Sequence, residues 1–300
     1  MPDIGTFGSA YAQTGRLGTY LSRLGVDHPG TPSVDGLRQL HRAHVERVPY
    51  EVLDIQAGIA TPVDPDGCAA RVERGRGGYC VQLNSAFHHL LTGLGYQVTM
   101  HRAGVQAAPA APPVSPDDPA PHLALSVWLD GQDWFVDVGL GDGLHEPLPW
   151  QAGTYRQGPF TFRLSPSAAG PPGWRFDRAP RGAIAGLDIA TAPATTADFA
   201  AWHEFLSTSR ESRLVRVVAV MRRDAGGSDV LQGCMLRRIG ERTESEREIT
   251  SMAQWYGVLT EKFGLRLDGL DEQQRNELWT RVRAAHDRWL ASGRNRRTDA

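Results

Sequence analysis

The spacing of apolar side chains changes near residue 97 from a helical to a strand period, and this change limits the folds open to the chain. Before it, apolar residues recur at helical spacing, as between residues 37 and 48, in a stretch that Pro49 ends. After it, Val98 and Met100 alternate with polar neighbours, as they would in a strand. We therefore predict a mostly helical first third followed by a β-rich middle third.

A further helix is predicted from Cys80 to Leu94, because Leu83, Phe87 and Leu91 share one face at helical spacing. The last third mixes both periods. There we expect strands over Leu214 to Met221 and Val230 to Ile239, and helices over Thr250 to Phe263 and Glu272 to Leu290.

The middle third carries a strong hairpin signal. Strands are predicted over residues 122–129 and 134–138, joined by Asp130-Gly131, a dipeptide typical of a two-residue turn. With that turn, His122 and Asp137 fall on one face of the hairpin, with Cα atoms roughly 7–8 Å apart. A loop longer by one residue would put them on opposite faces. Residues 106–121 hold six prolines and are predicted to form an irregular loop.

Composition excludes several classes of function. A formal net charge of -2 gives no strong field for nucleic acid or an anionic membrane. The three cysteines lack the close spacing of a disulfide framework or a zinc site, so no metal is expected. No apolar run reaches the about 18 residues of a membrane span, and residues 1–15 show no signal-peptide pattern. We therefore expect a cytoplasmic protein with reduced thiols.

The stretch from Arg74 to Cys80 contains three glycines and leads into the predicted helix. Glycines there leave backbone N–H groups open and allow another chain segment to approach closely. A cysteine in the first turn feels the positive end of the helix dipole, which favours thiolate over thiol. Cys80 is therefore the candidate nucleophile, whereas Cys68 and Cys234 lack this setting and are predicted to be structural.

A thiol nucleophile needs a base, and the base needs a group that orients it. His122 and Asp137 meet this need because the hairpin places them together, with His101 and His145 as alternative bases. Arg76 is predicted to brace the glycine-rich segment by pairing with Glu51, because its planar fork suits a carboxylate. Asp54 is a second candidate partner.

These motifs resemble the arylamine N-acetyltransferase family. Arg76-Gly-Gly-Tyr-Cys80-Val-Gln-Leu-Asn84 is similar to the family's cysteine motif, and His122-Leu-Ala-Leu125 and Val136-Asp137-Val-Gly139 are similar to its histidine and aspartate segments. The similarity extends roughly from Tyr20 to Leu267. It implies an α+β fold with a cysteine-protease-like Cys-His-Asp core: a helical bundle (1–97), a β-barrel (98–205) and an α/β lid (206–300).

The resemblance also implies a function. In a ping-pong reaction, Cys80 would take acetyl from acetyl-CoA and pass it to a small aromatic amine or hydrazine, with His122 moving the proton and Asp137 orienting His122. Gly139, Gly141 and Gly143 would lie beside the pantetheine and phosphates of the donor. No nucleic-acid or membrane partner is implied.

Two departures from the family pattern bear on the substrate. Leu140 and Leu214 stand where the family often has phenylalanine, at positions that line its acceptor pocket. Two other functions therefore stay open: amide formation from a carrier-bound acyl chain, as in a macrolactam-forming amide synthase, and a transglutaminase-like or cysteine hydrolase activity.

Overall fold

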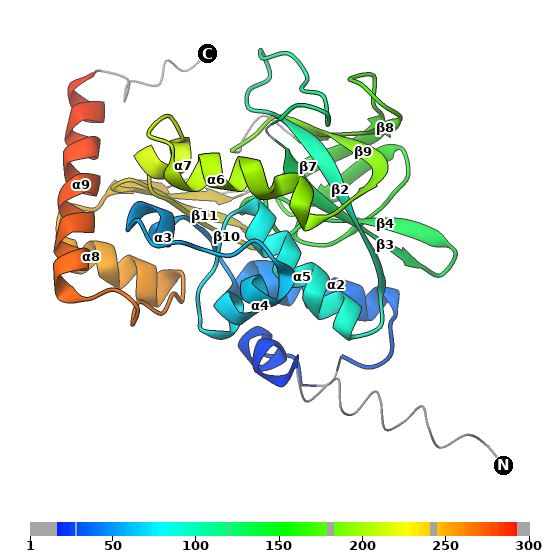
Figure 1. Ribbon diagram of the computed structural model, residues 1–300, viewed down its shortest axis with the longest axis horizontal. Helices are drawn as coiled ribbons and strands as arrows, with labels where there is room; N and C mark the ends of the chain where they lie inside the picture. The colour runs from blue at the N-terminus through cyan, green and yellow to red at the C-terminus, as the bar shows by residue number, and fades with distance from the viewer. Residues whose placement is uncertain (1–16, 28, 120, 179–182, 241–244, 293–300) are drawn as a thin grey trace.

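The structure is a computed structural model that describes residues 17–27, 29–119, 121–178, 183–240 and 245–292 (Figure 1). The N-terminal segment of residues 1–15 considered above lies outside these ranges. Among the described residues, no helix is long and apolar enough to cross a membrane.

The first third is helical, as the sequence predicts. Residues 17–24 form one helical segment, and the others are α2 (Val34–Arg47), α3 (Leu53–Gln56), α4 (Pro65–Glu73) and α5 (Cys80–Gly93), with the two-residue strand β1 (Tyr50–Glu51) between them. The caps are local: the Ser33 side chain accepts from the Gly36 N–H at the start of α2, and Asp64 accepts from Gly67 at the start of α4.

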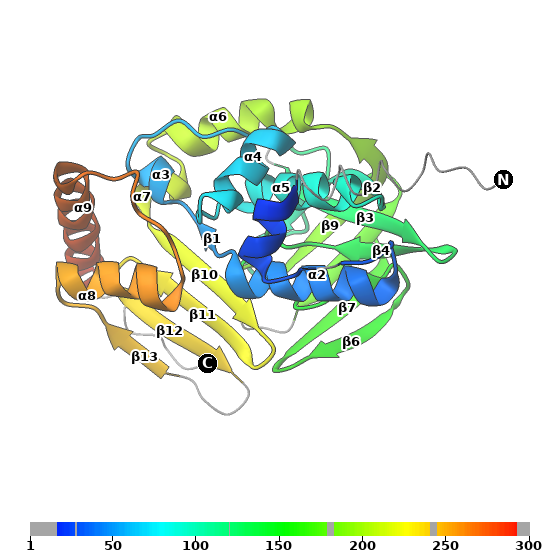
Figure 2. The same ribbon diagram turned by 90° about the horizontal axis from the view of Figure 1, so that it is seen from below.

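An eight-stranded antiparallel sheet forms the middle of the chain and curls into a barrel (Figures 1 and 2). In spatial order its strands are β5 (Leu148–Pro149), β4 (Gln132–Val136), β3 (His122–Leu129), β2 (Gln97–Gln106), β9 (Gly186–Ala194), β8 (Gly173–Arg178), β7 (Phe160–Pro166) and β6 (Gly153–Gln157). Its interior is apolar, with Phe135, Phe162 and Phe176 fully buried.

The hairpin of β3 and β4 has the predicted register, with Leu129 opposite Gln132 and Leu125 opposite Val136. Asp130 and Gly131 both have positive φ values, 53° and 79°, as the two-residue turn with matching twist requires. The second strand runs over Gln132–Val136 rather than 134–138, so the prediction was wrong at both ends.

The last third contains α6 (Ala200–Thr208), preceded by the short helix η1 (Thr196–Phe199), and a second sheet. That sheet, which we call the lid sheet, has the order β1, β10 (Ala219–Asp224), β11 (Gly227–Gln232), β12 (Met235–Gly240) and β13 (Ser245–Glu248). Helices α7 (Arg213–Arg216), α8 (Met252–Gly257), η2 (Val258–Lys262) and α9 (Glu272–Ala291) complete it. Figure 1 shows α9 beside the lid sheet, on the side away from the barrel.

Two strand predictions in this part were wrong. The segment from Leu214 to Met221 begins as helix α7, because the Ser212 side chain caps it by accepting from the Leu214 N–H. The segment from Val230 to Ile239 is two strands rather than one. Gly233, with φ of 57°, turns the chain so that Gln232 pairs with Met235.

Candidate active site

Cys80 is the first residue of α5 and is half-buried, at the rim of the helical core. The glycines before it allow close approach of the β1 segment. A Cβ on Gly77 would lie 1.9 Å from the Pro49 carbonyl oxygen, and the Gly78 oxygen accepts from the Glu51 N–H at 2.9 Å. The backbone therefore requires glycine at position 77, in order to hold the start of α5 against the end of α2.

His122 and Asp137 meet as the hairpin register predicts. His122 Nε2 donates to Asp137 Oδ2 at 2.7 Å, and both side chains are almost fully buried. The Cys80 sulfur lies near enough to the same imidazole to help raise the pKa of His122. Because Asp137 uses Nε2, Nδ1 is the ring nitrogen left for the sulfur. The structure thus brings Cys80, His122 and Asp137 together, with the imidazole between the sulfur and the carboxylate as predicted.

The pKa of His122 reflects this position. Burial alone would lower it, but the negative charges of Asp137 and Cys80, with their hydrogen bonds, raise the pKa to about 10. The imidazole is therefore protonated near neutral pH. A cation held between a carboxylate and a sulfur stabilises the thiolate, which is the nucleophilic form of cysteine.

Asn84, which lies one turn after Cys80 on α5, is a site residue that the sequence argument did not assign. Its Nδ2 donates to the Leu123 oxygen at 2.6 Å and to Asp137 Oδ1 at 2.9 Å, and its Oδ1 accepts from the Val138 N–H at 2.9 Å. These bonds explain why β4 ends at Val136. The Val138 N–H and the Leu123 oxygen both bond the Asn84 side chain on α5 instead of continuing the pairing of the two strands. Its place within the cysteine motif was the available signal.

The predicted ion pair of Arg76 with Glu51 is present, and Asp54 joins it. Arg76 Nη2 lies 3.2 Å from Glu51 Oε1 and 2.7 Å from Asp54 Oδ1. The sequence argument missed Arg71, which binds both acids and also donates to the Gly77 oxygen at 3.1 Å. Two arginines and two carboxylates therefore form a buried, charge-balanced cluster under the glycine-rich segment.

Gly139 packs against the nucleophile. A Cβ there would lie 2.8 Å from both the Cα and the carbonyl oxygen of Cys80, so the close approach again requires glycine. Gly141, with φ of 70°, lies against Tyr50 and Met221, and Gly143 lies against Leu140. This local packing accounts for the three glycines, and their predicted contact with the donor stays a prediction.

Leu140 and Leu214, the predicted pocket residues, belong to different apolar clusters. Leu140 is buried in the barrel core, whereas Leu214 is half-buried at α7 and packs against the helical core, as Cys80 does. Gln56 Nε2 donates to the Leu214 oxygen at 2.5 Å and holds α7 in place. The role of the two leucines in a substrate pocket stays a prediction.

The alternative bases are engaged elsewhere. His101 Nε2 contacts Ser126 Oγ at 2.9 Å, and His145 Nε2 contacts Glu46 at 2.7 Å. Cys68 and Cys234 are buried, and burial raises their pKa values to about 12 and about 11. A thiol that stays protonated is a poor nucleophile, so Cys80 is the cysteine placed for chemistry. Among the described residues, no group of three or more His, Cys, Asp or Glu side chains could hold a metal ion.

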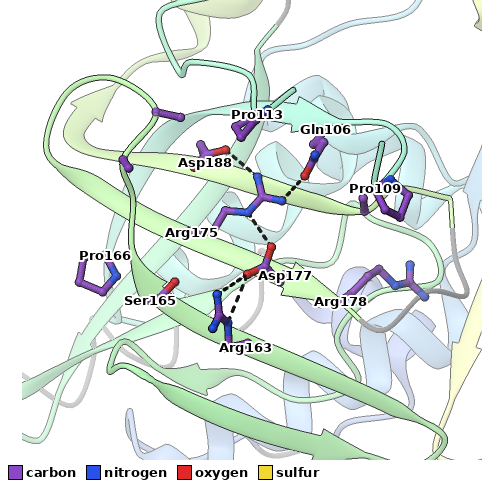
Figure 3. A pocket seen from close by; sticks show the side chains of 13 residues that line it. Gln106, Pro109, Pro113, Arg163, Ser165, Pro166, Arg175, Asp177, Arg178 and Asp188 are labelled. Atoms are coloured by element: carbon purple, nitrogen blue, oxygen red, sulfur yellow. Dashed lines mark hydrogen bonds and ion pairs between the residues drawn. The ribbon is translucent and has the colours of Figure 1, made fainter. Parts of the chain in front are cut away.

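A hollow of about 870 Å³ lies on the outer face of the barrel, and its lining does not include Cys80 (Figure 3). Arg175 stands in it and donates to Gln106, to Asp177 at 2.7 Å and to Asp188 at 2.6 Å. The charges that face this hollow are thus largely paired with one another.

Comparison with known proteins decides the family. A family model described as N-acetyltransferase matches residues 33–272. This chain belongs to the arylamine N-acetyltransferase family. Solved arylamine N-acetyltransferase structures superpose on most of it. The enzyme of Mycobacterium marinum in complex with CoA gives a TM-score of 0.77 at 26% identity, over 89% of this chain and 98% of that one. The enzyme of Mycobacterium smegmatis gives 0.77 at 26% identity, over 89% and 97%.

The α+β fold predicted from the resemblance is confirmed, since these neighbours share the three-part, cysteine-protease-like architecture. The domain boundaries at residues 97 and 205 stay predictions. Barrel strand β3 nevertheless contributes Leu123 and Leu125 to the same apolar cluster as the N-terminal helices, so the first two parts share a core.

Curated relatives match over a shorter stretch. The arylamine N-acetyltransferase / N-hydroxyarylamine O-acetyltransferase of Salmonella typhimurium is 33% identical over 149 residues, which is 49% of this chain and 51% of that protein. Proansamycin X synthase of Amycolatopsis mediterranei is 35% identical over 151 residues, 49% and 56% respectively. The matched stretch thus spans about half the length of these curated relatives.

Proposed function

We propose that this chain transfers an acetyl group from acetyl-CoA to the nitrogen of an aromatic amine or hydrazine, through a thioester on Cys80. The observation that carries the proposal is the buried His122, held at 2.7 Å by Asp137 and near enough to Cys80 for the sulfur to help raise the His122 pKa. That arrangement supplies a nucleophile, a proton carrier and its orienting group. The CoA complex of the Mycobacterium marinum relative supports the choice of donor.

The reaction would proceed in two halves. The Cys80 thiolate attacks the thioester carbonyl of the donor, and backbone N–H groups at the start of α5 stabilise the oxyanion. The CoA thiolate leaves and takes the proton from the His122 imidazolium. The amine then attacks the acetyl-Cys80 carbonyl, neutral His122 accepts the amine proton, and the Cys80 thiolate is released. Asp137 keeps the imidazole oriented and stabilises its charge in both halves.

Mass spectrometry after mixing with acetyl-CoA alone tests the first half-reaction. An adduct of about 42 daltons on Cys80, one acetyl group, is the covalent intermediate expected of this nucleophile. Cys80→Ala should abolish both the adduct and the transfer while leaving the fold intact. Cys234→Ala is the matched control, because that thiol is buried and should not be acetylated. An adduct that persists in Cys80→Ala, or that forms on another residue, would reject the assignment.

A second candidate is amide formation from a longer acyl thioester. It is favoured by the similarity to proansamycin X synthase and by leucine rather than phenylalanine at positions 140 and 214. A series of acyl thioesters of increasing length separates the two candidates. Acetyl transfer predicts that acylation of Cys80 slows with chain length, whereas the amide synthase predicts that it accelerates.

Hydrolysis, the third possibility, is tested by following the acyl-Cys80 adduct without an amine. A transferase should keep the adduct until an amine is added, and a hydrolase should lose it to water. The prediction of a cytoplasmic location accompanies this proposal, since Cys80 must be reduced to act. The prediction of no nucleic-acid or membrane partner stays a prediction.

A further inference from the structure

A second cavity, of about 890 Å³, lies in the lid between α9, α7 and the strands β11 and β12. We call it the lid cavity; Figure 1 shows α9 standing beside the lid sheet at this place. Its size falls within the range of sites that hold small organic molecules. Much of its wall is apolar and includes Val215, Val218, Val282 and Trp289.

The charged groups of the lid cavity are unbalanced. Its lining includes four arginines and one acid: Arg216, Arg237, Arg281, Arg288 and Glu246. Glu246 pairs with Arg237 at 2.9 Å. Within the part of the chain that the structure describes, no carboxylate pairs with Arg216 or Arg288, and Arg281 binds only the Gln56 backbone oxygen. An excess of positive charge therefore faces an apolar cavity, in a chain whose net charge is -2.

Two buried nitrogen atoms in the same lining have no hydrogen-bond partner among the described residues. His286 is 5% exposed, and its Nε2 makes no hydrogen bond. The nearest acid oxygen, Glu248 Oε1, lies 3.4 Å away and already accepts from Arg283 at 2.6 Å. Arg237 Nε is also buried without a partner. Buried polar atoms in native proteins are normally satisfied, so these two mark a wall of the cavity whose polar groups are incompletely paired.

We propose that the lid cavity binds an amphipathic organic anion, with its apolar body against α9 and the segment from Val215 to Val218, and its carboxylate or phosphate head between Arg216 and Arg288. A guanidinium binds either head group through charge-assisted hydrogen bonds. The apolar wall accounts for the body of the ligand, and the unpaired cations account for its charge. This site lies beyond the proposed acyl transfer, because its lining contains none of Cys80, His122 and Asp137.

Isothermal titration calorimetry with decanoate, decyl phosphate and decanol tests the site. The two anions are expected to bind with one molecule per chain, and the uncharged alcohol at least about tenfold more weakly, since a charge-assisted bond supplies this much affinity. The tighter of the two anions identifies the head group. No binding of either anion, or binding of decanol as tight as theirs, would overturn the proposal.

Variants locate the binding. Ala285→Trp fills the cavity from α9, and the double variant Arg216→Ala with Arg288→Ala removes the unpaired cations. Each should weaken anion binding at least about tenfold. Arg247→Ala, an exposed arginine on β13 outside the lining, is the matched control and should bind as the unchanged chain does. Thermal unfolding of each variant verifies the fold.

Cys80→Ala separates this inference from the proposed function. It removes the thioester chemistry, and Cys80 is not part of the lining of the lid cavity, so anion binding should be unchanged. Anion binding that Ala285→Trp leaves intact would place the ligand elsewhere and overturn the proposal, whatever the outcome of the acetylation experiment.

Discussion

The arginines under the Cys80 site and the arginines of the lid cavity are the same residue type in opposite situations. Arg71 and Arg76 are buried, and each is paired with both Glu51 and Asp54. Arg216 and Arg288 are exposed, and no described carboxylate pairs with either of them. In the first region, the guanidinium groups are fully used in ion pairs that fix the backbone before Cys80. In the second, the guanidinium groups of Arg216 and Arg288 remain available to bind a ligand.

Buried charges and exposed charges therefore serve different ends in this protein. A buried charge needs a partner to offset its desolvation, and the partners then fix one geometry. An exposed guanidinium has no such need and can stay unpaired at little cost. Substitutions in the two regions should therefore differ in the property that they change, and the following predictions test this contrast.

Asp137→Asn should produce the largest effect, a loss of acyl transfer of about 10²- to 10⁴-fold, the range expected when an oriented base is lost. The neutral amide cannot stabilise the His122 imidazolium, and the pKa of His122 should fall from its raised value of about 10. Steady-state kinetics measures the loss, and NMR titration of the imidazole measures the pKa. An active Asp137→Asn variant would leave only a reactive thiol.

Arg76→Ala should reduce the free energy of unfolding by about 3–5 kcal/mol, the cost of removing one partner from a buried ion pair. It leaves Glu51 and Asp54 with Arg71 as their shared cation. Chemical unfolding in urea measures the change. Arg38→Ala, at a pair in which Asp35 is 97% exposed, is the matched control and should cost about 1 kcal/mol or less. Equal losses in the two variants would contradict the distinction between buried and exposed arginines.

Acid should destabilise the helical part through His41 and His44. Burial lowers their pKa values to about 4 and about 3, so they are neutral when folded. Unfolded histidine takes up its proton near pH 6.5, so stability is fully present above that pH. It should fall by about 1.4 kcal/mol per pH unit for each histidine as pH drops toward 4.

Urea unfolding at a series of pH values measures this slope. His44→Phe, beside Tyr20 and Phe87, should flatten it by the share of one histidine. An unchanged slope in that variant would mean that carboxylates alone cause the acid sensitivity. His122 acts in the opposite direction: its raised pKa stabilises the fold below pH 6.5, and that contribution is lost as pH rises through about 10.

Arg288→Ala should produce the smallest effect, a change in unfolding free energy within about 0.5 kcal/mol, because this exposed side chain has no described acid to lose. Its effect should appear only when an anion is present, as a smaller rise in melting temperature. A destabilisation comparable with that of Arg76→Ala would show that Arg288 has a structural partner.

Much of the site could be predicted because its geometry is set by short-range rules. The turn at Asp130-Gly131 fixes the hairpin register, and the register places His122 beside Asp137. The glycines before Cys80 predict close approach, which the Pro49 carbonyl supplies. These inferences needed only the local chain and the two-residue period of a strand.

The rest depended on contacts between distant segments. Asn84 stands in the cysteine motif, but nothing near it shows that it will bind Leu123 and Val138, and nothing near Leu214 shows that Gln56 will hold its carbonyl group. Arg71 was missed for the same reason, since its partners lie 17 and 20 residues away. The Ser212 cap of α7, by contrast, was a local signal that the strand prediction overlooked. Apolar residues such as Val215 and Val217 favour a strand locally, and the tertiary contacts of α7 override that preference.

The bonds of Asn84 have a consequence for how the site would be lost. One side chain on the nucleophile's helix joins β3, through Leu123, to the segment that follows β4, through Asp137 and Val138. The Val138 amide should therefore exchange with solvent deuterium only when α5 separates from the barrel. Heating should abolish the chemistry in one cooperative step, with no intermediate in which the histidine and aspartate persist together after the cysteine has moved away.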